Sequence, residues 1–240
     1  MRGKALVLAM LMCITSRAQA DYQCDVKLRN DIVIAPEYVR VISPSGEIKI
    51  SKQGDIKSNG RLFPIDAELR KKAADYQAEL RRDLPWIEKE ANHQIEISRQ
   101  ALDKIVTCKL GEKSRVRTRL VNLDLQLRKQ MDRIIEHRGY DLIFHHQMLV
   151  KIHQQSEQLI QKAVGGILRD GFNEIGLNLA NDNNHPLNTI LSDIDELQQE
   201  VTSVWNTRQQ EFQKFGQEVC NIAKFSENQY SDLMAGIKSP

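Results

Sequence analysis

The chain has 240 residues, with 34 lysines and arginines against 32 aspartates and glutamates, and only 5% of its residues are aromatic. Three of the bases and none of the acids lie in residues 1–20. The remainder is therefore close to neutral, which argues against a protein whose main task is to bind nucleic acid. Its length is enough for one large domain or two small ones.

Residues 1–20 have the pattern of a cleavable export signal. Arg2 and Lys4 precede an unbroken apolar run over Ala5–Thr15, and residues 18–20 are Ala-Gln-Ala. Small residues at these positions suit a signal peptidase, so cleavage is predicted after Ala20. The apolar run is too short to span a bilayer, and no later stretch is long enough to do so. We therefore expect an exported protein that is soluble once processed.

Three cysteines remain after cleavage, namely Cys24, Cys108 and Cys220. An exporting pathway permits disulfides. A bridge between Cys24 and Cys220 would tie the two ends of the chain together, and closing so long a loop is worth about 4–5 kcal/mol in the chain-entropy model. Cys108 would then be unpaired, and it is expected to be a small buried apolar residue. The pattern of cysteines alone leaves the other two pairings open.

Residues 21–65 alternate between apolar and polar positions, which predicts a small antiparallel β-meander. Asn59-Gly60 is a strong signal for a two-residue hairpin turn, joining Asp55–Lys57 to Arg61–Phe63. One face of this sheet is apolar and must pack on another element. The short β-branched runs are Ile32–Ile34, Tyr38–Ile42 and Ile48–Ile50, and the apolar face comprises Val39, Val41, Ile48 and Ile50.

Residues 66–240 change to a helical period, with Asp66 as a predicted N-cap. We expect Pro85 to end a first helix and to begin a second one that stops at Gly111. A third helix is expected over Lys113–Arg138 and is closed by Gly139, and a fourth runs over about His145–Ala180. A linker is expected at residues 181–186, and the last helix carries a nearly heptad apolar stripe from Ile190 to Ile222. The predicted fold class is α+β, a small N-terminal antiparallel β-meander followed by a long, mainly antiparallel helical bundle or hairpin.

Several segments carry a likeness to a known family. They are DYQCDV, ADYQAELRRDLPWIEKE, ALDKI, DRIIEHR, VGGIL and FQKFGQEVC. Together they resemble the YggN-like proteins, exported proteins of Gram-negative bacteria that form a domain of unknown function with no established active site. The resemblance covers nearly the whole chain after the signal. It implies a periplasmic location and supports a bridge between Cys24 and Cys220.

The sequence shows no motif typical of an enzyme, so we expect no catalytic residue, cofactor or metal ion. Glu90 and His93 form one Glu-x-x-His pair, whereas a di-metal bundle needs two such pairs and further glutamates. His145, His146 and His153 cluster loosely and are expected to be structural or solvated. We also find no nucleophile elbow and no glycine-rich phosphate loop.

Two stretches could form interaction surfaces. The first is a basic stretch that could meet anionic lipid headgroups or acidic proteins, although a solvated helix end would look the same. The second is a glycine-containing helical stretch. Glycine lowers the stability of a helix, so another feature should offset this cost. The alternatives are close helix–helix approach, a hinge, or an apolar face for a membrane or a partner. The candidate residues are Lys113, Arg115, Arg117 and Arg119 in the first, and Gly165, Gly166 and Ile167 in the second.

These patterns favour a non-enzymatic role in macromolecular interaction, of a scaffold or chaperone-like kind, in the cell envelope. The expected partner is an envelope protein, an unfolded client or a second copy of the chain. Binding to a membrane surface through the fourth helix is an alternative hypothesis. An enzyme that acts on envelope material through carboxylates assembled in three dimensions is a further one.

Overall fold

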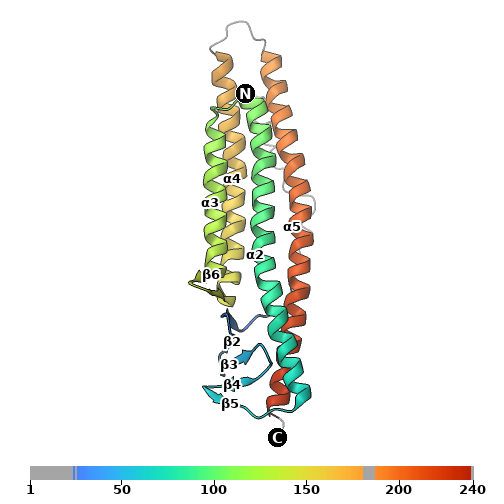
Figure 1. Ribbon diagram of the computed structural model, residues 1–240. Helices are drawn as coiled ribbons and strands as arrows, with labels where there is room; N and C mark the ends of the chain where they lie inside the picture. Colours follow the sequence, from blue (N-terminus) through green and yellow to red (C-terminus); the bar gives the residue numbers. More distant parts are fainter. Residues whose placement is uncertain (1–23, 25, 181–186, 239–240) are drawn as a thin grey trace.

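The computed structural model describes residue 24, residues 26–180 and residues 187–238. The predicted export signal and the predicted linker at residues 181–186 lie outside these described residues. The described chain folds into a seven-stranded antiparallel sheet and four helices, which are drawn in Figure 1. The α+β prediction is therefore confirmed.

The N-terminal strands form the predicted meander. Their apolar positions share one face, where Val39, Val41 and Ile50 are fully buried and Ile48 is nearly so. The turn at Asn59-Gly60 has positive φ at both residues, 48° and 83°, as a type I′ hairpin requires. The bounds of these strands are β1 Asp31–Ile34, β2 Tyr38–Ser43, β3 Gly46–Ser51, β4 Ile56–Ser58 and β5 Arg61–Leu62.

A second hairpin extends this sheet and corrects the prediction of a helix over Lys113–Arg138. The helix ends at Ile134, and β6 (Ile135–Arg138) and β7 (Asp141–Phe144) follow it. Gly139 has φ 63° at the first position of the two-residue turn, which suits a type II′ hairpin rather than a helix cap. Strand β7 pairs with β1, so the sheet order is β5-β4-β3-β2-β1-β7-β6.

Consecutive helices run antiparallel along the rod, and the most extensive packing is of α2 on α5 and of α3 on α4. The predicted cap is confirmed, because the Asp66 carboxylate accepts a hydrogen bond from the Leu69 N–H at 2.7 Å. The last helix, with 52 residues, is longer than the predicted stripe and measures about 78 Å. The bounds are α2 Ala67–Leu110, α3 Arg115–Ile134, α4 His146–Ala180 and α5 Leu187–Lys238.

Pro85 does not divide α2, which contradicts the prediction of two helices joined at this residue. A proline inside a helix removes one backbone hydrogen bond and costs about 3 kcal/mol. Leu84 and Ala91 are both buried, and their spacing of two turns keeps them on one face only if the helix continues. The packing of both halves of α2 therefore outweighs the local cost.

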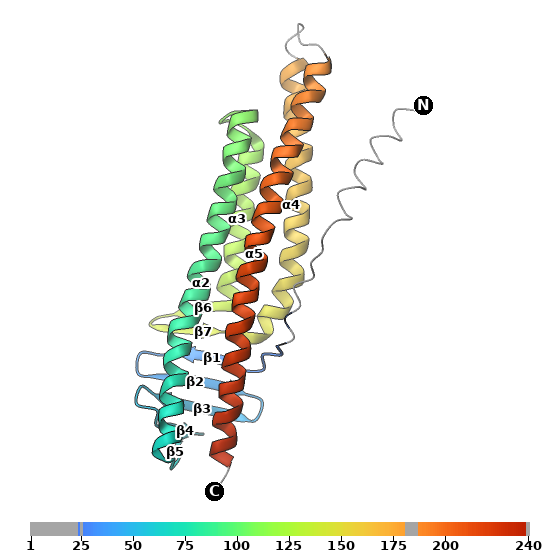
Figure 2. The same cartoon turned by 90° about the vertical axis from the view of Figure 1, so that its right-hand side faces the viewer.

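The elements are arranged in two layers along a rod. Helices α2 and α5 form one layer, and Figure 2 shows them crossing one face of the sheet. The sheet and the α3–α4 pair follow one another along the rod in the second layer (Figure 1).

At the turn between β3 and β4, Gly54 lies so close to the Arg70 carbonyl oxygen that a Cβ there would be 2.0 Å from it. Only glycine fits this contact between the sheet and α2.

Two hydrophobic cores result from this arrangement. In the first, the inner face of the sheet packs against Tyr76, Leu80 and Leu84 of α2 and Leu233 of α5. The second lies among the four helices beyond the sheet. Its buried members are Leu102, Ile105, Val106, Val116, Leu120, Ile167, Ile175, Leu197 and Val201.

Candidate functional site

The basic stretch lies where α2 ends and α3 begins. Gly111 ends α2 with φ 85°, and the Ser114 hydroxyl accepts a hydrogen bond from the Val116 N–H at 3.1 Å. The first helical N–H of α3, that of Arg115, donates to a carboxylate oxygen of Glu174 at 2.7 Å. Helix α4 thus caps α3 and fixes where the basic side chains emerge.

A groove of about 530 Å³ runs between α3 and α4. Most of its exposed surface comes from apolar atoms, but its lining includes three cations, Arg115, Arg119 and Lys162, with Asp170 as its acid. The other lining residues are Thr118, Asn122, Leu123, Gln126, Leu159 and Ala163. The α3–α4 groove therefore combines part of the predicted basic stretch with residues next to the predicted glycine stretch.

Arg119 lines this groove and contacts the buried Gly166 behind it. Arg119 Nε donates to Asp170 Oδ2 at 3.0 Å, and a second guanidinium nitrogen contacts the same oxygen. These hydrogen bonds lower the pKa of Asp170, so its carboxylate stays ionised. A Cβ on Gly166 would lie only 2.6 Å from the Arg119 guanidinium. Glycine at position 166 therefore leaves room for Arg119 to reach Asp170.

Other cations of the basic stretch are neutralised within the molecule. Arg117 forms two hydrogen bonds with Asp103 of α2, at 2.8 and 3.0 Å. The neighbouring Lys109 pairs with Glu196 and Glu200 of α5, at 2.9 and 3.2 Å. Lys113 is exposed beside them. The positive charge that is clustered in the sequence is thus partly balanced by acids from distant parts of the chain.

Only some glycines of this stretch lie at close contacts. Gly166 and Gly171 sit at close contacts, with Arg119 and with Leu197 of α5, as the close-approach prediction requires. Gly165 and Gly176 would meet no atom within 4 Å if they carried a Cβ. Ile167 corrects our expectation of a surface residue, because it is 1% exposed. It lies in the second core, so it cannot offer an apolar face to a membrane or a partner.

Replacing Gly165 and Gly166 separately by alanine tests this contact. Gly165→Ala is expected to raise the free energy of unfolding by about 0.5–1 kcal/mol, the usual gain in helix propensity at an open site. Gly166→Ala has the same gain but displaces the Arg119 guanidinium, so it should be less stable than Gly165→Ala by about 1 kcal/mol. Urea unfolding of both variants measures the difference. Equal stabilisation by the two would show that Arg119 does not depend on Gly166.

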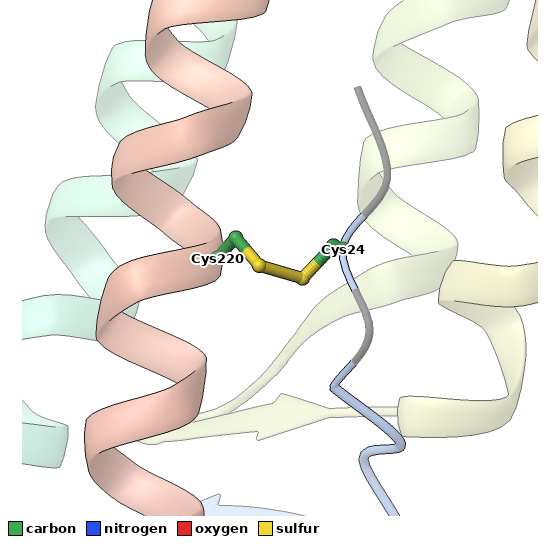
Figure 3. Close-up of a disulfide and its surroundings, with 2 residues drawn as sticks. All are labelled: Cys24 and Cys220. Carbon is green, nitrogen blue, oxygen red and sulfur yellow. A yellow bond between two sulfur atoms is a disulfide. The ribbon is translucent and has the colours of Figure 1, made fainter. Parts of the chain in front are cut away.

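The disulfide joins Cys24 to Cys220 across 196 positions of the chain, with Cα atoms 5.8 Å apart (Figure 3). This is the pairing that the family resemblance favoured. Cys108 is the free cysteine, but it is exposed, which contradicts the prediction of a buried residue. Its neighbours Ile105 and Val106 take the buried positions of that turn of α2.

The segment that follows Cys24 forms one wall of a second groove, of about 940 Å³. The opposite wall is the C-terminal part of α5, and the turn between β2 and β3 closes one side. The segment is held at two places, by the disulfide and by a hydrogen bond from the Arg29 backbone N–H to the Glu227 carboxylate. Burial raises the pKa of Glu227. The disulfide therefore positions residues 26–30 against α5.

Sequence reasoning missed one cluster, at the junction of the sheet and α4. Asp31 Oδ1 accepts a hydrogen bond from the backbone N–H of His146 at 2.9 Å. The same oxygen is hydrogen-bonded to Nδ1 of the His146 ring at 2.6 Å. His145 Nε2 lies 3.1 Å from a carboxylate oxygen of Glu136. Among the described residues, no group of three or more His, Cys, Asp or Glu side chains could hold a metal ion. The cluster joins β1 and β6 to the start of α4.

Comparison with known proteins assigns the family. The family described as "Protein of unknown function (DUF2884)" matches residues 24–239. The chain belongs to this family. It is 38% identical to the "Uncharacterized protein YggN" of Escherichia coli K12 over 239 residues, which cover 99% of this chain and all of the relative. The proteins of the same name from strains O6:H1 and O157:H7 match equally well.

No solved structure matches the chain. In the part of the chain that the structure describes, none of the helices is long and apolar enough to cross a membrane. The family match and the 38% identity to the YggN relatives confirm the family resemblance that the sequence indicated. Membership brings no activity with it, because the relatives are uncharacterised.

Proposed function

We propose that this DUF2884 protein is exported to the periplasm, where it acts without catalysis as a binding protein. Its partner is an acidic segment of another envelope protein, held in the α3–α4 groove. The observation that carries the proposal is the groove itself, which gathers three cations beside a single acid already paired with Arg119. The groove therefore has a positive surplus for a partner to neutralise.

The two remaining cations are available for such contacts. Arg115 is exposed and uses only its backbone N–H toward Glu174, and Lys162 is also exposed. Among the described residues, neither side chain forms an ion pair with a carboxylate. Thr118, Asn122 and Gln126 add hydrogen-bonding groups along the same groove. An open groove with these groups along it suits an extended acidic peptide, in which successive carboxylates can pair with separate cations.

A binding role fits the groove better than catalysis. A general acid or base needs a pKa near the working pH, whereas Arg119 lowers the pKa of Asp170 away from neutrality. The periplasmic location is supported by the predicted export signal and by the disulfide, because structural disulfides persist in oxidising compartments.

Site-specific photo-crosslinking in living cells tests the proposal. A photoreactive residue at Asn122, inside the groove, is expected to form adducts with an envelope protein, whereas one at the exposed Lys104 of α2 is not. Adding Arg115→Glu and Lys162→Glu should abolish the adduct, since like charges would then face the acidic partner. The matched control keeps the photoreactive residue at position 122 and reverses the charge of two exposed cations elsewhere, by Lys104→Glu and Lys129→Glu. Adducts that are equal in all backgrounds would contradict the proposed site, and an unprocessed chain in the cytoplasm would contradict export.

A further inference from the structure

The outer face of the sheet carries a row of cations. The apolar face packs on α2 and α5, and side chains alternate along a strand, so Arg40 and Lys49 point to the opposite face. The register places Arg40 directly opposite Lys49, and Lys49 directly opposite Lys57. Three cations thus stand side by side on three adjacent strands, about 4.8 Å apart at the backbone. Figure 1 shows α2 and α5 on the other side of these strands.

This arrangement is costly for the isolated molecule. Like charges directly opposite each other on neighbouring strands destabilise a sheet. Glu47 offsets part of the repulsion, since it lies 3.5 Å from Arg40 and 3.7 Å from Lys49. Among the described residues, Lys57 has no ion-pair partner, and the buried Nε of Arg40 has no hydrogen-bond partner. Lys49 also lies over the ring of Tyr38, with its Nζ 5.2 Å from the ring centroid. The row nevertheless keeps three cations against one acid.

Exposed apolar side chains accompany the cations. Leu62 is opposite Lys57 in the same row and is 66% exposed. Ile42 follows Arg40 on the same face of β2 and is 36% exposed. None of these residues lines either of the two grooves, so this face is separate from both.

We infer that the outer face of β2–β5 docks onto an anionic lipid bilayer surface. A face with several cations and flanking apolar side chains matches such a surface, because headgroup charge attracts the cations and the apolar side chains enter the interface. An acidic peptide would need the cations alone and would leave Leu62 and Ile42 without a role. This inference is independent of the α3–α4 groove, which lies on other elements.

Co-sedimentation with vesicles tests the inference. The processed protein is expected to pellet with vesicles that contain phosphatidylglycerol at low salt, and not with pure phosphatidylcholine vesicles. Lys49→Gln with Lys57→Gln should weaken the partition coefficient about 25-fold, about fivefold for each cation removed near the surface. Lys71→Gln with Lys104→Gln removes the same charge from exposed positions on α2, which packs on the opposite face of the sheet, and should change the partition less than twofold. Thermal unfolding confirms that both double variants are folded.

Three results would overturn the inference. The first is failure of the unaltered protein to pellet with anionic vesicles, and the second is an equal loss of binding in both double variants. The third is binding of polyglutamate through Lys49 and Lys57 without binding to vesicles, which would assign the face to an acidic polypeptide instead.

Discussion

Replacing Cys24 by serine is expected to lower the free energy of unfolding by about 5 kcal/mol. The bridge to Cys220 closes a loop of 196 positions, and the chain-entropy gain rises with loop length to about this value. For a chain of this size the midpoint of thermal unfolding should fall by about 10–20 °C. Thermal and urea unfolding of the oxidised protein and of Cys24→Ser measure the effect.

Cys108→Ser is the matched control, because it removes the exposed free thiol and leaves the bridge intact. It should unfold within about 0.5 kcal/mol of the unaltered protein. Reduction with dithiothreitol should reproduce the Cys24→Ser result. A Cys24→Ser protein as stable as the control would show that the bridge does not constrain the unfolded chain as assumed.

The bridge also has a local consequence. Without it, residues 26–30 keep the hydrogen bond of Arg29 with Glu227 as an anchor on α5. One anchor leaves the segment with more conformational freedom, and it forms a wall of the second groove. Reduction should therefore change the accessibility of this groove as well as the stability of the protein.

The regular part of the fold could be predicted from the sequence because its signals are local. Alternation in β2 and β3 and the Asn59-Gly60 turn depend on neighbouring residues, and each was confirmed. The β6–β7 hairpin was missed because its strands are four residues long and follow a helical stripe that reaches Ile134 without a break. Its stability comes from β1, more than one hundred residues earlier, which no local pattern reveals.

The candidate site shows the same limit in its electrostatics. The sequence gives Arg117 and Arg119 as neighbouring cations, but their acids, Asp103 and Asp170, come from α2 and α4. A count of charge along the chain therefore overstated the basic stretch and missed Lys162, which the groove adds to it. Likewise, the cation row on the sheet exists only once the strand register is known.

The two-layer arrangement relates the proposed binding surfaces to each other. The sheet and the α3–α4 pair belong to the same layer, one after the other along the rod (Figure 1). A bilayer on the outer face of the sheet would then run alongside α3 and α4 rather than across the end of the rod. A partner in the α3–α4 groove would consequently be held close to the membrane surface.

Replacing Ile167 by aspartate is the second change for which we expect a large effect. Ile167 is 1% exposed among Val116, Leu120 and Leu197 of the second core. Aspartate there loses the apolar packing and places a carboxylate where water is excluded, so the cost should exceed about 4 kcal/mol. Urea unfolding followed by circular dichroism measures the loss. Hydrogen exchange should show that α3 and α4 lose protection before β2 and β3, because the sheet has its own core.

Leu125→Asp is the matched control on α3, since Leu125 is 58% exposed and should tolerate the same new charge within about 0.5 kcal/mol. The comparison separates two interpretations of the glycine-containing helix. If Ile167 is a core residue, only Ile167→Asp unfolds the bundle. If both variants were equally stable, Ile167 would be accessible to water, and an apolar binding face on α4 would again explain the glycines around it.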